Sequence, residues 1–264
     1  MARRQNSAEA GFEAAFAALL AEREEGASAN QAKVAEIIKN VRTRGDAALI
    51  DYTERFDRIE LDAAGLRLGA DEIAAAAEKC PAETRDALAL AAERIEDFHK
   101  RQLPADLDHR DEAGVRMGLR WGAIGAAGLY VPGGTAAYPS SVLMNALPAK
   151  AAGVPRLVMT VPTPDGALNP AVMAAAEICG IGEIYRVGGA QAVAALAYGT
   201  AGIAPVDKIV GPGNEWVAEA KRQVFGKVGI DMIAGPSEIL VVADAANDPT
   251  WIAADLLSQA EHDT

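Results

Sequence analysis

From residue 118 onward the chain repeats one pattern, in which a short apolar run is followed by glycines and then by a segment with helical periodicity. The apolar runs fall at residues 128–131, 156–161, 183–187, 206–210 and 230–244. Short apolar runs that alternate with helical segments are typical of parallel strands joined by crossover helices. The pattern therefore predicts an α/β fold built on a doubly wound parallel sheet.

The residues before this pattern predict a helical module. Apolar side chains recur at helical spacing in residues 8–25 and 31–44, with Gly26 and Ser28 between the two segments. We expect two helices there, a third beginning near Asp46, a short strand over residues 59–68, and further helices over residues 71–80 and 81–102. We expect His99 near a helix end and His109 in a polar loop, both as solvated residues without a functional role.

The glycines follow the expected strands, at residues 132–134, 188–189 and 211–214. In an open parallel sheet, ligands bind beyond the carboxyl ends of the strands, where glycines admit a close backbone approach and helix N-termini favour anions. A single glycine turn is more often only a tight loop. Several glycine turns in one domain favour a nucleotide or phosphate ligand. The dinucleotide fingerprint itself is not present, because Gly122, Gly125 and Gly128 precede a strand instead of following one.

The last stretch, residues 248–264, carries a possible metal site. Asp248 can cap a helix that begins at Pro249. On that helix Asp255, Gln259 and His262 share one face, which gives three oxygen or nitrogen donors, while the apolar residues of the helix, Trp251, Ile252 and Leu256, are expected to pack it. Spacing alone is weak evidence, because most single histidines on helices are structural or solvated and an amide is a poor zinc ligand.

Composition narrows the class of protein. The formal net charge of −12 over 264 residues argues against a nucleic-acid partner, which would require a basic footprint. Cys80 and Cys179 stand far apart, which fits two reduced cysteines better than a disulfide framework. Apolar runs are too short to span a membrane, and the N-terminus lacks the apolar core of a signal peptide. We therefore expect a cytoplasmic globular protein.

Several long motifs resemble one family. Residues 128–154, GLYVPGGTAAYPSSVLMNALPAKAAGV, closely resemble histidinol dehydrogenase, the zinc enzyme of histidine biosynthesis. The resemblance continues through EIYRVGGAQAVAALAYGT from Glu183, VDKIVGPGNEWVAEAKRQVFGKVGIDMIAGPSEILVVAD from Val206, and IAADLLSQAEHDT at residues 252–264. Upstream, RGDAALIDYTERFD and FHKRQLP also look like that family, so the similarity covers nearly the whole chain.

The resemblance implies an oxidoreductase that converts L-histidinol to L-histidine through L-histidinal with two NAD, and one zinc per subunit. It implies Gln259 and His262 as zinc ligands, and these two with Ser237 as substrate contacts. The implied NAD contacts are Tyr130, Gln191 and Asn214. The family's catalytic Glu-His pair and its last two zinc ligands lie beyond residue 264, so we assign no catalytic residue and expect the chain alone to be inactive.

The resemblance also implies a homodimer and two incomplete Rossmann-like parallel-sheet domains beside an N-terminal helical segment. The helical segment would be residues 1–58, the first domain residues 59–127 plus 238–264, and the second, inserted domain, with the NAD-contacting turns, residues 128–237. Because the first domain lacks elements, we expect exposed apolar surface and a tendency to associate.

Two other functions remain open from the sequence. The same scaffold could oxidise another small alcohol, such as a sulfonated diol. Alternatively, the chain could be a non-catalytic fragment that only binds a nucleotide or a partner chain. Residues Ser237, Gln259 and His262 favour histidinol over another alcohol, and nucleotide binding without turnover would favour the fragment.

Overall fold

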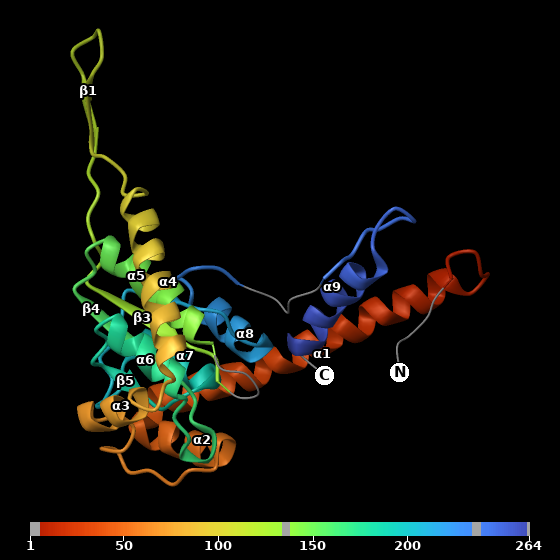
Figure 1. Cartoon of the computed structure of the whole chain (residues 1–264), viewed down its shortest axis with the longest axis horizontal. Coiled ribbons are helices and arrows are strands. Elements are labelled where there is room, and N and C mark those ends of the chain that lie inside the picture. Colours follow the sequence, from red (N-terminus) through yellow and green to blue (C-terminus); the bar gives the residue numbers. More distant parts are fainter. Residues whose placement is uncertain (1–5, 134–137, 234–238, 263–264) are drawn as a thin grey trace. The chain divides into compact units, whose positions relative to one another are not determined.

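A computed structural model describes residues 6–133, 138–233 and 239–262, without the side chains of residues 21–29 and 259–262 (Figure 1). The contacts divide the chain into two compact units, Met1–Ile233 and Ala234–Thr264. We describe each unit by itself.

A parallel five-stranded sheet forms the centre of the first unit. Its order is β5-β4-β3-β6-β7, and every neighbouring pair is parallel. The strands are β3 (Ala126–Tyr130), β4 (Arg156–Thr160), β5 (Ile184–Tyr185), β6 (Lys208–Val210) and β7 (Gly229–Ile230). Both faces of β3 are buried, as expected for a central parallel strand. The predicted α/β class with a parallel sheet is therefore confirmed.

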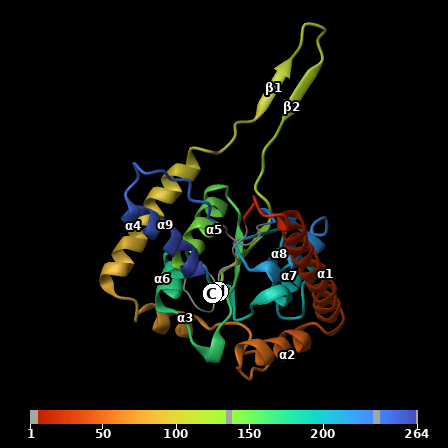
Figure 2. The same ribbon diagram turned by 90° about the vertical axis from the view of Figure 1, so that its right-hand side faces the viewer.

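Helices cover both faces of this sheet. One face packs against α1 (Phe12–Arg44), α2 (Asp46–Asp57), α7 (Gly189–Tyr198) and α8 (Glu215–Val224), and Figure 2 shows α1, α7 and α8 together on that side. The other face packs against α3 (Ala70–Ala77), α4 (Ala82–Lys100), α5 (Pro139–Ala151) and α6 (Pro170–Ile178). Each face of the sheet has its own hydrophobic core, and successive strand residues point to opposite faces. Tyr130 and Val158 therefore lie in the first core, and their neighbours Leu129 and Met159 lie in the second.

The predicted break in the first helix is wrong. Residues 12–44 form one continuous helix, α1, through Gly26 and Ser28. A glycine inside a helix costs about 1 kcal/mol relative to alanine, which weakens the helix without ending it. The helix ends instead at Gly45, whose φ of 58° favours glycine, and α2 begins at Asp46 as predicted.

A β-hairpin projects from the first unit (Figures 1 and 2). Its antiparallel strands are β1 (Leu107–Arg110) and β2 (Arg116–Leu119), and every residue of both strands is exposed. His109 lies in β1, so the predicted loop is wrong there, although the residue is exposed as expected. His99 lies in the last turn of α4 as predicted, where its Nδ1 is 2.6 Å from Gln102 Oε1.

The strand predicted over residues 59–68 is wrong, since only an isolated bridge between Arg67 and Tyr185 forms there. The strand predicted over residues 230–244 is also wrong for most of its length, because β7 covers only Gly229–Ile230 and residues 239–244 have no regular structure. Leu240 and Val242 are each 87% exposed. An apolar pattern alone does not make a strand, because a strand also needs a neighbouring strand to pair with.

The second unit contains α9 (Pro249–His262). Asp248 caps this helix as predicted, since its Oδ1 accepts a hydrogen bond from Thr250 N at 2.7 Å. Trp251 and Leu256, which we expected to be packed, are 74% and 54% exposed. The predicted exposed apolar surface is thus present in this unit.

The predicted division into a helical segment, a first domain and an inserted domain stays a prediction. Its boundary at residue 128 falls inside β3, which begins at Ala126. Among the helices that the structure describes, none is both long and apolar enough to cross a membrane.

Candidate functional site

The strand order fixes where a ligand would bind. The chain runs from β3 to β4 and β5 on one side, and then returns to form β6 on the other side of β3. In a doubly wound sheet, ligands bind at the carboxyl ends of the strands at this point of reversal. Tyr130 ends β3, and Gly211 directly follows β6, so these two residues flank the expected crevice.

The turn after β6 lies directly against the end of β3. Gly211 has a φ of 126°, and a Cβ atom there would lie 2.1 Å from the carbonyl oxygen of Tyr130. Any side chain at this position would collide with backbone atoms, which cannot swing aside as a flexible side chain can. Only glycine therefore allows this contact between the two strand ends.

The turns after β3 and β5 press against the turn after β4. A Cβ atom on Gly133 would lie 2.7 Å from Cγ of Pro162, and one on Gly188 would lie 2.6 Å from Cβ of the same proline. The glycine turns found in the sequence thus gather at one edge of the sheet.

Tyr130 connects two of these turns. Its buried phenol oxygen accepts a hydrogen bond of 3.1 Å from Gly189 N, at the start of α7. Burial raises the pKa of Tyr130 to about 12, so the phenol keeps its proton at neutral pH and can donate it to a ligand.

Gln191 belongs to the same turn. It is buried in the first turn of α7, and a Cβ atom on Gly189 would lie 2.8 Å from Gln191 Oε1. The amide therefore folds back over the glycine turn that Tyr130 contacts.

Asn214 directly precedes α8 and caps its N-terminus. Its Oδ1 accepts a hydrogen bond of 3.2 Å from Val217 N, which caps the helix, and the residue is exposed. The cap uses the amide oxygen, while the amide nitrogen is a donor at the same helix end. All three predicted cofactor contacts thus lie at the carboxyl edge of the sheet: Tyr130 ends β3, Gln191 lies in the first turn of α7, and Asn214 precedes α8.

The sequence did not point to Asp57, the last residue of α2. Only 7% of this residue is exposed, and its Oδ2 accepts a hydrogen bond of 3.0 Å from Thr163 N, in the turn after β4. Burial raises the pKa of Asp57, and its charge in turn raises the pKa of Tyr130. A charged residue at a helix end usually predicts a solvated side chain, so no local signal marks it as buried.

Three buried hydroxyls accompany Asp57. They belong to Thr53, one turn earlier on α2, to Thr163, and to Thr160, which pairs with Tyr130 across the sheet. None of the three has a hydrogen-bond partner among the residues that the structure describes. Buried hydroxyls normally find a partner in protein or ordered water, and these three depart from that pattern.

We expect Asp57→Asn to raise the melting temperature at neutral pH. The pKa of Asp57 is raised in the folded chain. The wild type therefore loses stability as the pH rises from the ordinary pKa of an aspartate to the raised pKa of Asp57. The neutral variant avoids this loss, so the gain should shrink towards about pH 3, where the wild-type carboxyl is also protonated. Thermal unfolding across a pH series measures it.

Asp165→Asn is the matched control, with the opposite sign. The guanidinium of Arg58 lowers the pKa of Asp165, so this carboxylate stabilises the fold above its ordinary pKa and ceases to do so as pH falls. We expect a small loss of melting temperature at neutral pH, because the pair is exposed. Equal effects of both variants at every pH would contradict the assignment for Asp57.

The predicted metal and substrate residues lie largely outside the described part of the chain. Ser237 falls within residues 234–238, and the side chains of Gln259 and His262 are not described, although both residues belong to α9. Asp255 is exposed on the same helix. Within the described residues no three His, Cys, Asp or Glu side chains gather in a way that could hold a metal. The zinc site therefore stays a prediction.

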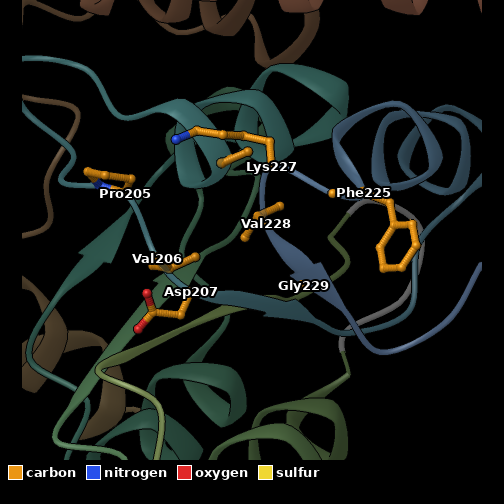
Figure 3. A pocket seen from close by; sticks show the side chains of 9 residues that line it. Pro205, Val206, Asp207, Phe225, Lys227, Val228 and Gly229 are labelled. Atoms are coloured by element: carbon orange, nitrogen blue, oxygen red, sulfur yellow. The ribbon is translucent and has the colours of Figure 1, made fainter.

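An open pocket of about 370 Å³ lies at the opposite edge of the sheet, before β6 and β7 (Figure 3). One of its charged residues, Asp207, accepts a hydrogen bond of 2.8 Å from Ala126 N, so its carboxylate serves the sheet. The pocket contains none of the predicted site residues. Its lining consists of Ala197, Pro205, Val206, Asp207, Phe225, Gly226, Lys227, Val228 and Gly229.

Fold and site together define a doubly wound α/β protein whose glycine turns gather at the point where the strand order reverses. The family model for histidinol dehydrogenase matches residues 20–264, so the chain belongs to the histidinol dehydrogenase family.

Comparison with individual relatives gives the same family. The chain is 67% identical to a histidinol dehydrogenase of Rhodospirillum rubrum over 98% of its length and 60% of the relative's. It is 65% identical to one of Ruegeria pomeroyi, over 96% and 58%. The crystal structure of histidinol dehydrogenase from Elizabethkingia anophelis superposes with a TM-score of 0.80 at 40% identity, over 88% of this chain and 54% of that one. The chain thus spans about 60% of the length of the curated relatives it matches.

Proposed function

We propose that this chain supplies the cofactor-binding part of a zinc- and NAD-dependent enzyme that oxidises L-histidinol to L-histidine through L-histidinal. One observation carries the proposal: Tyr130, Gln191 and the turn of residues 211–214, which ends at Asn214, lie at the same edge of the sheet. Doubly wound sheets bind nucleotides at this edge. Family membership supports the substrate. In this proposal the protein acts in the cytoplasm as a homodimer.

The edge suits NAD chemically. Its glycines leave room for a close approach of the cofactor, and two helices, α7 and α8, begin there with backbone N–H groups that favour a pyrophosphate. Tyr130, Gln191 and Asn214 offer neutral hydrogen-bonding groups for ribose or nicotinamide. When bound, NAD would accept the hydride from the substrate. Zinc would be held through Gln259, His262 and ligands outside this chain, and it would anchor the substrate.

The test compares the chain with a longer version that adds the residues matching the rest of the relatives. Zinc content and NADH production are measured on both, with L-histidinol and, separately, with a sulfonated propanediol as substrate. We expect one zinc per subunit and turnover of L-histidinol in the longer version only. Turnover of the diol but not of L-histidinol would mean that the proposed substrate is wrong and that the enzyme oxidises another small alcohol. NADH binding without turnover in either version would favour a non-catalytic role.

Tyr130→Phe tests the cofactor edge directly. The change removes the hydroxyl that accepts from Gly189, so we expect a stability loss of about 1 kcal/mol. If the phenol also donates to the cofactor, the dissociation constant for NADH should rise about tenfold. Calorimetric titration of the chain with NADH measures the affinity.

Tyr185→Phe is the matched control. This buried tyrosine donates to the carbonyl oxygen of Gly202 at 2.8 Å, away from the glycine turns, so its loss should lower stability similarly but leave NADH affinity unchanged. Equal weakening of NADH binding by both variants would show that Tyr130 acts only through stability.

A further inference from the structure

The two residues of one ion pair bind the backbone N–H and the backbone C=O of Gly211. Asp231 Oδ2 accepts a hydrogen bond of 2.8 Å from Gly211 N, and Lys221 Nζ donates one of 2.8 Å to Gly211 O. Lys221 and Asp231 also form an ion pair with each other. We refer to Lys221, Asp231 and the Gly211 peptide as the Gly211 clamp.

The clamp joins elements that are far apart in sequence. Gly211 directly follows β6, Lys221 lies in α8, and Asp231 directly follows β7. Asp231 is itself fixed, because its N–H donates to Ile209 O at 3.1 Å and its Oδ1 accepts from Met232 N at 2.7 Å. The ammonium group is therefore held against a rigid carboxylate at the end of the sheet.

Stability alone does not explain this ion pair. The Lys221 side chain is 2% exposed, and an ammonium group withdrawn from water loses hydration that the pairing only partly restores. Apolar residues of similar volume in place of a buried ion pair often leave stability unchanged or improved. We therefore look for a role of Lys221 and Asp231 that apolar side chains could not perform.

The conformation of Gly211 identifies that role. A φ of 126° turns the peptide out of the regular sheet, and a buried N–H or C=O in such a place needs partners outside the ladder. Asp231 satisfies the N–H and Lys221 the C=O. From this fixed peptide the chain continues through Pro212 and Gly213 to Asn214, which caps α8.

We propose that Lys221 and Asp231 are positioning residues, which hold the Gly211 turn in the conformation that presents Asn214 to the cofactor. This inference rests on the proposed NAD site. Neither residue is assigned a contact with the cofactor, because each acts through the backbone of Gly211.

The test uses the double variant Lys221→Met/Asp231→Leu, which removes both hydrogen bonds to Gly211 but fills the site with apolar side chains. Lys208→Met is the control, because it removes the same charge from an exposed position on β6. NADH affinity by calorimetry, melting temperature, and amide hydrogen exchange of Gly211, Gly213 and Asn214 by NMR are measured on both variants and the wild type.

We expect the double variant to fold with a lowered melting temperature, because Gly211 N and O lose their side-chain partners. We also expect it to bind NADH about tenfold more weakly and to exchange the Gly211 amide faster. Lys208→Met should leave all three values unchanged. A folded double variant with wild-type NADH affinity would overturn the inference. If the double variant does not fold, Lys221→Met, which removes the hydrogen bond to Gly211 O and leaves a partly exposed carboxylate, is judged by the same criteria.

If the proposed NAD site is wrong, the experiment gives a result that differs from failure of the positioning role. If the wild-type chain does not bind NADH, the NAD site is wrong, and the clamp is judged by amide exchange alone. Faster exchange of the Gly211, Gly213 and Asn214 amides in the double variant than in Lys208→Met then supports a positioning role for Lys221 and Asp231, and equal exchange refutes it.

Discussion

Gly211→Ala should destabilise the chain by about 3 to 5 kcal/mol, the sum of backbone strain and overpacking. The strain arises because alanine rarely adopts a φ of 126°, and the overpacking arises because its Cβ would lie 2.1 Å from the carbonyl oxygen of Tyr130. Relief would require β3 and the turn after β6 to separate. Denaturant unfolding followed by circular dichroism measures the free energy of unfolding.

Gly226→Ala separates the two contributions. Gly226 also has a positive φ, of 96°, but a Cβ atom there would meet nothing within 4 Å. We expect a loss of only about 1 to 2 kcal/mol, from strain alone. Similar losses at both glycines would mean that the contact between Gly211 and Tyr130 relaxes without cost.

Asp231→Ala is the second change with a large expected effect, a loss of about 3 to 5 kcal/mol. It leaves the ammonium group of Lys221 buried without its carboxylate and leaves Gly211 N without its acceptor. The same unfolding experiment measures the loss.

Lys221→Met provides the comparison for this prediction. The Asp231 side chain that it leaves behind is 30% exposed, so water can hydrate the carboxylate, and the loss should be smaller than for Asp231→Ala. A larger loss for Lys221→Met would show that the packing of the lysine stem, and not the unpaired charge, decides the stability of the clamp.

The sheet and its turns were predictable because their signals are local. An apolar run such as residues 156–161 is too short for a helix, and the glycines and Asn169-Pro170 that follow such runs mark turns and helix starts. The observed strand β4 and helix α6 agree with these predictions. The strand order then brought Tyr130, Gln191 and the Asn214 turn to one edge.

Features that depend on contacts distant in sequence were not predictable. The burial of Asp57 results from the packing of the end of α2 against the turn at Thr163, more than a hundred residues later. Lys221 and Asp231 each look like ordinary surface charges in the sequence. The apolar run at residues 239–244 shows the reverse error, because its pattern suits a buried strand, while all its side chains except the partly buried Val241 are exposed.

Pro162 is shared by two of the glycine turns, since both Gly133 and Gly188 pack against it. Neighbouring segments that share a contact respond to substitution together, so the effects of changes in these turns should not add. In the proposed NAD site, a substitution in one of these two turns should therefore also disturb the other. The edge of the sheet therefore constrains evolution as a unit, and new specificity there would require coordinated changes in several turns.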